Sequence, residues 1–152
     1  MTPEEARKQT VKHINRVGEL LDDVIEELKK RAIVHDFSKT QSPEVEMFDR
    51  VTGDLEGLTY GTPEYEAQKQ KMLGMALKHH YEHNRHHPEH FEDGIDGMNL
   101  IDLIEMFCDW RAATERHADG DIFKSIEYNQ KRFNMNPQLA SILRNTAKWI
   151  DG

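Results

Sequence analysis

Apolar residues recur at three- and four-residue spacing along most of the chain, which is the spacing of one face of an α-helix. The clearest stripe runs from Pro3 to about Val34, at Ile14, Val17, Leu21, Val24, Leu28 and Ala32. The same spacing predicts a helix from Thr62-Pro63 to about Asn84 and another from Asn99 to about Ala118. No segment of useful length alternates with a period of two, so we expect no sheet.

Turn and capping residues mark the segments between these helices. Ser42-Pro43 precedes a short predicted helix, because serine caps and proline suits the first helical position. Residues 49–61 contain three glycines and little periodicity, and they are predicted to form a loop. Residues 85–98 contain Pro88, Gly94 and Gly97 and are predicted to be irregular.

The C-terminal part of the chain predicts two further helices. Asp119-Gly120-Asp121 ends the preceding helix and caps the next, which runs to about Phe133. Asn136-Pro137 then opens the last helix. The complete pattern predicts an all-α fold, a bundle of about six helices that forms a single domain over residues 1–152.

Charge and composition exclude several classes of protein. Lys and Arg number 20 and Asp and Glu 28, which gives a net charge of −8. Broad nucleic-acid binding is not expected from a chain of this sign. Such affinity comes from Lys and Arg side chains that neutralise the phosphates and release their counterions. A single cysteine excludes a disulfide framework. No apolar run is long enough for a membrane span, and the first residues lack an apolar signal core, so we expect a cytoplasmic protein.

Histidine is the unusual residue of this chain, because it both titrates near neutral pH and ligates transition metals. There are nine histidines, and six fall within twelve residues: His79, His80, His83, His86, His87 and His90. The first two continue the apolar stripes of the preceding helix, and we interpret both as metal ligands. For the other four, the interpretations as ligands, substrate contacts or surface residues stay open.

A His-Asp pair stands near the end of the first predicted helix, in the string HDFSK. An imidazole beside a carboxylate suits Zn, Fe, Mn or Ni better than Ca. By themselves, however, His35 and Asp36 favour the simpler interpretation, a surface pair next to a solvated lysine. His13 shares a helical face with Val17 and Val24, so that a ligand and a hydrogen-bonded core residue are equally good interpretations.

The helix from Asn99 carries two candidate acidic ligands. Asp102 is the third helical position if Asn99 caps, and this capping role is sufficient to explain it. Asp109 lies too far into the helix for capping and shares a face with Met106 and Ala113. A carboxylate that faces a core must be paired or bound to a cation. Asp109 is therefore the predicted acidic ligand, with Asp102 in reserve.

The order of these motifs resembles the HD phosphohydrolase superfamily, which is named for its His-Asp pair. The most similar pattern is that of the HD-GYP branch, with its strings H-D-I-G-K and H-H-E. The matching strings here are His35-Asp36-Phe37-Ser38-Lys39 and His79-His80-Tyr81-Glu82, and HINRVGEL around His13 is similar to the first-ligand helix. The chain is also similar to small uncharacterised bacterial and phage proteins that contain HDxSK and NRHHPEH strings.

The resemblance implies an HD-domain-like fold with one or two divalent transition metals per chain, drawn from Fe, Mn, Zn, Ni and Co. Asp36 would bridge two metals, His79 and His80 would serve the second, and Lys39 would contact the substrate phosphate. The basic ligand set would be His13, His35, Asp36 and Asp109.

This sequence departs from the HD-GYP pattern at three points. It has no histidine between Asp36 and His79, it lacks the GYP string, and Gln9 stands where an acid would precede His13 by four residues. Hydrolysis of cyclic dinucleotides is therefore not implied.

These observations predict a metal-dependent hydrolase that acts on a small phosphoester such as a nucleotide through an activated water. Besides Asp36, the residues expected to act on the substrate are Lys39 and Arg85, which would neutralise phosphate oxygens, with Arg132 as a further candidate. A histidine between His83 and His90 would protonate the leaving oxygen, and His83 is taken as that residue.

Two alternatives from other classes remain. Some members of the HD superfamily hold two irons and activate oxygen, and the surplus of histidines is compatible with iron. The second alternative is a helical module that is stabilised by metal, has no catalytic activity, and binds a protein or sequesters a ligand. In each case we expect a small-molecule or protein partner and no association with a membrane. Whether the chain forms homo-oligomers stays open.

Overall fold

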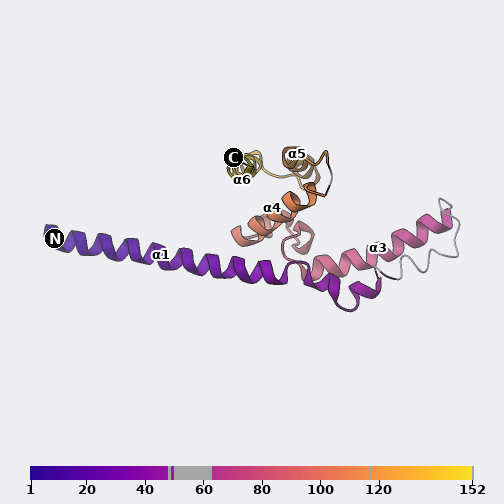
Figure 1. Ribbon diagram of the computed structural model, residues 1–152, viewed down its shortest axis with the longest axis horizontal. Coiled ribbons are helices and arrows are strands. Elements are labelled where there is room, and N and C mark those ends of the chain that lie inside the picture. Colours follow the sequence, from indigo (N-terminus) through magenta and orange to yellow (C-terminus); the bar gives the residue numbers. More distant parts are fainter. Residues whose placement is uncertain (48, 50–62, 117, 152) are drawn as a thin grey trace. The chain divides into compact units, whose positions relative to one another are not determined.

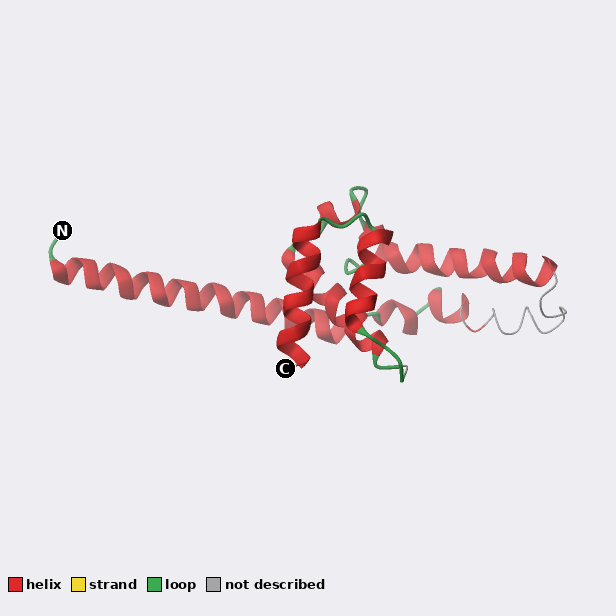
Figure 2. Ribbon diagram, turned by 90° about the horizontal axis from the view of Figure 1, so that it is seen from above, coloured by secondary structure: helices red, strands yellow, loops and turns green. Residues whose placement is uncertain are grey.

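The computed structural model describes all residues except 48, 50–62, 117 and 152. Its α-helices are α1 (Pro3–Val34), α3 (Pro63–His83), α4 (Leu100–Thr114), α5 (Ile122–Arg132) and α6 (Pro137–Asp151). The described residues contain no strand (Figure 1, Figure 2). The predicted all-α class is therefore confirmed.

The described chain divides into two units, residues Met1–His35 and Asp36–Gly152. The expectation of one domain over residues 1–152 stays a prediction. Among the described residues, no helix has the length and apolar character that a membrane crossing requires.

The N-terminal unit is the single helix α1, whose bounds agree with the predicted stripe. Thr2 caps it: its hydroxyl accepts from the Glu5 amide at 3.2 Å, and the Glu5 carboxylate accepts from the Thr2 amide at 2.6 Å. Pro3 fills the first helical position, where its missing N–H costs nothing. The helix ends at Val34, and His35 is its C-cap.

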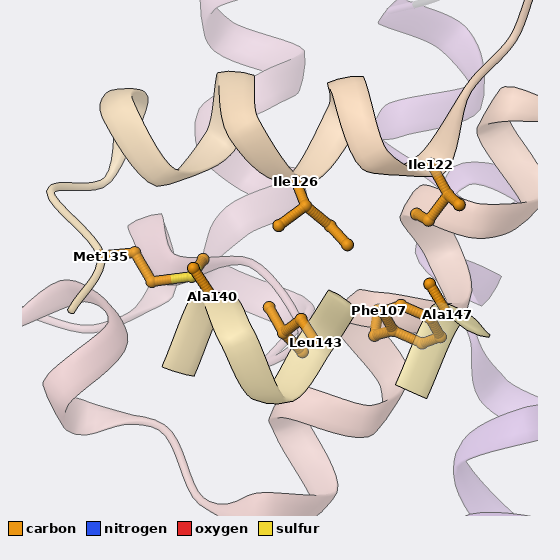
Figure 3. Close-up of a cluster of buried hydrophobic side chains, with 7 residues drawn as sticks. All are labelled: Phe107, Ile122, Ile126, Met135, Ala140, Leu143 and Ala147. Atoms are coloured by element: carbon orange, nitrogen blue, oxygen red, sulfur yellow. The ribbon is translucent and has the colours of Figure 1, made fainter. Parts of the chain in front are cut away.

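The core of the C-terminal unit lies between α4, α5 and α6. Figure 3 shows Ile126 of α5 facing Leu143 and Ala140 of α6. Helices α5 and α6 pack against each other, and two of the α6 residues in this interface, Ala140 and Ala147, are small. The buried cluster consists of Phe107, Ile122, Ile126, Met135, Ala140, Leu143 and Ala147.

Helix α4 begins as predicted and ends earlier than predicted. The Asn99 side chain accepts from the Asp102 amide at 3.0 Å, and the Asp102 carboxylate accepts from the Asn99 amide at 3.1 Å. This capping box confirms the structural interpretation of Asp102. The predicted end at Ala118 is wrong: the helix stops at Thr114, because the Glu115 amide bonds to the Ala112 and Ala113 carbonyls and tightens the last turn.

The remaining boundaries follow the turn signals. Asp121 caps α5 by accepting from the Phe123 and Lys124 amides, as predicted, and α6 begins at Pro137. Residues 44–47 are helical, in agreement with the short helix after Ser42-Pro43. The loop predicted over 49–61 lies outside the described residues except for residue 49, which is helical.

The irregular segment after α3 consists of two 3₁₀ turns, η2 (Pro88–His90) and η3 (Gly94–Gly97). These turns pack against each other, and η2 also packs against α3. The His90 ring fixes this arrangement, because its Nδ1 donates to the Tyr81 carbonyl oxygen at 2.8 Å. The chain is thereby turned back so that His86 and His87 lie against the end of α3.

Asp102 also binds a side chain, so its loss should cost more than a cap alone. Arg85 Nε and Nη2 donate to its two carboxylate oxygens at 3.2 and 3.0 Å, and Asp102 is fully buried. We predict that Asp102→Ala lowers the free energy of unfolding by about 1–2 kcal/mol. Urea denaturation measures this. The exposed Asp96→Ala variant serves as the control and should change stability by less than about 0.5 kcal/mol. A loss in Asp102→Ala no larger than that of the control would contradict the assignment.

Candidate metal centre

Asp36 begins the site in an unusual backbone conformation. Its φ is 55°, in the left-handed region, and it precedes the 3₁₀ turn η1 (Phe37–Thr40). Aspartate tolerates this region better than most residues. The helix therefore does not continue through Asp36 to Lys39. The turn nevertheless places Lys39 Nζ 2.7 Å from Asp36 Oδ2.

Four side chains of the C-terminal unit converge on one point, and we call Asp36, His80, His86 and His87 the inner cluster. Each offers one ligand atom, and these atoms all lie within 4.8 Å of one another. Asp36 Oδ1 is 3.2 Å from His80 Nε2 and 3.4 Å from His86 Nε2. His80 Nε2 is 2.9 Å from His87 Nε2.

These separations match those of ligands around one transition metal. Ligands at 2.0–2.1 Å in a tetrahedral site are about 3.3 Å apart. Three of the six separations within the inner cluster lie on either side of that value, and the others are within 4.8 Å. The inner cluster therefore has the donor types and the dimensions of a mononuclear metal site.

Carboxylates, one buried and one partly buried, hold the far side of two of these imidazoles. Glu44 is fully buried, and its Oε2 lies 3.1 Å from His80 Nδ1. Glu105 Oε1 lies 3.1 Å from His86 Nδ1. Carboxylates in this position fix the proton on Nδ1, turn Nε2 toward the metal and raise the basicity of the ring. The tautomer of each ring follows from these partners.

Asn84 also lies near His80, at 3.1 Å from Nδ1. Its amide hydrogens have other acceptors, because Nδ2 donates to the Ser38 hydroxyl at 2.8 Å and to the His80 carbonyl oxygen at 2.8 Å. His80 Nδ1 is therefore left to donate to Glu44, which keeps its Nε2 as the lone-pair atom of the ring.

The electrostatics of the inner cluster favour an ionised Asp36 and a neutral His87. Burial raises the pKa of Asp36, but the neighbouring His80 and His86 rings and the Lys39 ammonium outweigh burial and hold this pKa well below its usual range. Burial and the neighbouring His86 and His80 lower the pKa of His87 to about 3. At neutral pH, His87 is therefore uncharged, which is the form that ligates metals.

Glu44 is ionised for a similar reason. Burial raises the pKa of its carboxyl, whereas hydrogen bonds from His79, Ser38 and His80 lower it to a greater extent, so that this pKa lies below the ordinary value. The carboxylate keeps its negative charge inside the fold because imidazole and hydroxyl donors surround it.

The structure separates several of the residues that the sequence assigned to one centre. Asp36 and His80 belong to the inner cluster. His79 instead contacts Glu44 Oε1 through Nδ1 at 2.7 Å, and its ring stacks on that of His83 at 4.0 Å. A carboxylate oxygen of Asp109 lies within 4.8 Å of one of Asp36.

Three other predicted site residues belong to the N-terminal unit or have a contact of their own. His13 and His35 belong to the N-terminal unit, and their role as ligands stays a prediction. Arg85, half exposed, forms the bidentate pair with Asp102 described above and lies over the Phe91 ring at 4.9 Å. That pairing is sufficient to explain Arg85, and its role toward a substrate stays a prediction.

Sequence reasoning left His86 and His87 undecided and did not single out Glu44 or Glu105. The signal for the two histidines is the string NRHHPEH, in which Pro88 follows the end of α3 and forces a turn. No local signal exists for Glu44, because its contacts with His79 and His80 span 35 and 36 residues.

An open pocket of about 470 Å³ borders the inner cluster at His87. Asp109 also lines it, and Tyr81, Trp110, Tyr128 and Phe133 provide aromatic surface. The Trp110 and Phe133 rings are parallel, with centroids 6.4 Å apart. Arg132 lies over the Phe133 ring at 4.6 Å and pairs with Glu89 at 2.7 Å.

Comparison with known proteins places the chain in a family. The model of DUF5662, a family of unknown function, matches residues 2–149, and the chain belongs to this family. Neither the curated proteins nor the solved structures include a match. What the site does must therefore be argued from its geometry.

Glu44 provides a direct test of the arrangement around His80. A glutamine at this position offers one acceptor and one donor, so one of the two imidazole Nδ1 protons loses its acceptor. We predict that Glu44→Gln weakens metal binding about 10- to 100-fold. Competition with a chromogenic chelator measures the affinity. Glu46→Gln, exposed and two residues away, is the matched control, and equal affinities in the two variants would contradict the prediction.

Proposed function

We propose that this chain is a metal-dependent hydrolase that acts on a small phosphoester, with Asp36, His80, His86 and His87 as metal ligands. The observation that carries the proposal is the convergence of three imidazole Nε2 atoms and one carboxylate oxygen. Two of the rings have carboxylates behind them, the buried Glu44 and the partly buried Glu105. Nitrogen and oxygen donors of this kind suit Zn, Fe, Mn, Co and Ni.

A divalent metal held by these residues would lower the pKa of a bound water and supply hydroxide near neutral pH. Lys39 supports a phosphoester as the substrate, because its ammonium lies beside Asp36 and its side chain is 45% exposed. From there it reaches both the inner cluster and solvent. A cation at this position neutralises the charge on a non-bridging phosphate oxygen.

The pocket beside His87 supports a small substrate with a flat part. Its volume is in the range of small-molecule sites, and its aromatic walls suit a nucleobase or a similar ring. Arg132 provides one cation there, although Glu89 already pairs with it. A nucleotide fits this combination of aromatic surface, metal centre and lysine.

The acid that protonates the leaving oxygen is not assigned by this geometry. His83 was the predicted residue, and its contacts are with His79 rather than with the inner cluster. Its role stays a prediction, as does that of Arg85.

Tag-free protein should retain a transition metal through dialysis, and Asp36→Asn should lose most of it together with turnover. A panel of nucleotides with Mn, Co, Ni, Zn and Fe measures the activity, and elemental analysis measures the metal. A chelator should lower the melting temperature of the parent, because metal bound only to the folded state stabilises it.

Asp96→Asn, an exposed carboxylate in the same unit, is the control and should keep metal and turnover. A parent protein that binds metal but hydrolyses no phosphoester would refute hydrolysis. Oxygen uptake by the iron form in that case would favour the oxygenase alternative.

Lys39 is tested separately from the metal. We predict that Lys39→Ala keeps the metal content of the parent and lowers phosphoester turnover at least about ten-fold, roughly 1.4 kcal/mol of transition-state stabilisation. Lys78→Ala is the control, since Lys78 is exposed on α3 beside Glu82. Unchanged turnover in Lys39→Ala would show that this lysine only neutralises Asp36.

A further inference from the structure

Two histidines of α3 lie outside the inner cluster and form a pair of their own. His79 and His83 are one helical turn apart, and their rings stack with centroids 4.0 Å apart and an interplanar angle of 19°. The His79 side chain is 25% exposed, and His83 is exposed. Solvent and dissolved ions can therefore reach both rings.

The Nδ1 atom of each ring has an acceptor. His79 Nδ1 donates to Glu44 Oε1 at 2.7 Å, and His83 Nδ1 donates to the His79 carbonyl oxygen at 2.8 Å. A proton fixed on Nδ1 leaves the lone pair on Nε2. A carboxylate and a backbone carbonyl are the usual partners behind metal-ligating histidines, because they fix the tautomer and orient the ring.

From this arrangement we infer that His79 and His83 form a second, outer site for a divalent transition metal such as Zn²⁺ or Ni²⁺. Residues four apart on a helix share a face, so two imidazoles at this spacing can ligate one ion. Tetrahedral ligand atoms are about 3.3 Å apart. The lone pairs of the stacked rings run nearly parallel, so metal binding requires the exposed His83 ring to rotate out of the stack until both Nε2 atoms face one ion. Water completes the coordination at this exposed position.

Glu44 connects the outer site to the inner cluster. Its Oε1 contacts His79, and its Oε2 contacts His80 at 3.1 Å. Neighbouring residues of a helix point about 100° apart, so the two rings diverge while one buried carboxylate holds both. His79 and His80 therefore serve different ions, whereas the resemblance to HD proteins assigned them to the same one.

Titration of tag-free protein with Ni²⁺, after its resident metal has been removed with a chelator, is followed by calorimetry and tests the outer site. The parent should show two classes of Ni²⁺ site: a tight class, which is the inner cluster, and a weaker class, which is the outer site. His83→Ala should lose the weaker class and keep the tight one. His79→Asn should behave in the same way, because its amide nitrogen stands close to where Nδ1 stood and still donates to Glu44.

Glu82→Gln is the matched control, because it removes an exposed potential ligand from α3 next to His83 without touching the pair or the inner cluster. It should keep both classes. The inference is wrong if His83→Ala keeps both classes, or if His83→Ala and His79→Asn both lose the tight class as well.

The outer site does not depend on the proposed function, and the two fail separately. Asp36→Asn should lose the tight class and keep the weaker one. A protein whose weaker class disappears in His83→Ala but which turns over no phosphoester would support the outer site and refute the hydrolase. A protein that hydrolyses a phosphoester but whose weaker class persists in His83→Ala would support the hydrolase and refute the outer site.

Discussion

The negative charge of Asp36 is the constraint on which the site depends. Its Oδ1 lies within 3.4 Å of two imidazole nitrogens, and its Oδ2 lies 2.7 Å from the Lys39 ammonium. Once Glu44 and Glu105 hold the Nδ1 protons of His80 and His86, the Nε2 lone pairs and the Asp36 carboxylate point at the same place. Such a group of electron-rich atoms needs a cation or a proton at its centre, since it would otherwise be repulsive.

The fold meets this constraint by bringing together short segments around the end of α3. A left-handed residue and a 3₁₀ turn present Asp36 and Lys39, the last turn of α3 presents His80, and the turn before η2 returns His86 and His87. The buried cluster of α4, α5 and α6 stabilises the same unit, and α4 supplies Glu105. The function of the core is thus to hold irregular segments in a fixed geometry, which is how loops come to carry sites.

Helices could be predicted well from the sequence, because apolar spacing and capping residues are local signals. The bounds of α1 agree with its stripe, and Asn99 and Asp121 cap the helices that their side chains predicted. The end of α4 was misjudged because the tightening of its last turn depends on backbone hydrogen bonds rather than on a breaking residue.

The site could be predicted only in part. Asp36 and His80 carried a recognisable motif and lie in the inner cluster, whereas His86 and His87 depended on how the chain turns after α3. Glu44 was not identifiable, because nothing near it in the sequence indicates a contact with a histidine 36 residues away. The capping role of Asp102 could be predicted from the sequence, but its ion pair with Arg85 could be seen only in the tertiary structure.

The central claim is that three imidazoles and one carboxylate of the C-terminal unit hold one transition metal. X-ray absorption spectroscopy of tag-free protein carrying one equivalent of Zn²⁺ tests it most directly. The account predicts a first shell of nitrogen and oxygen at roughly 2.0–2.2 Å with the multiple-scattering signal of three imidazoles, reduced by one imidazole in His87→Ala. A spectrum of Zn²⁺ surrounded by water alone, or one unchanged in His87→Ala, would contradict it.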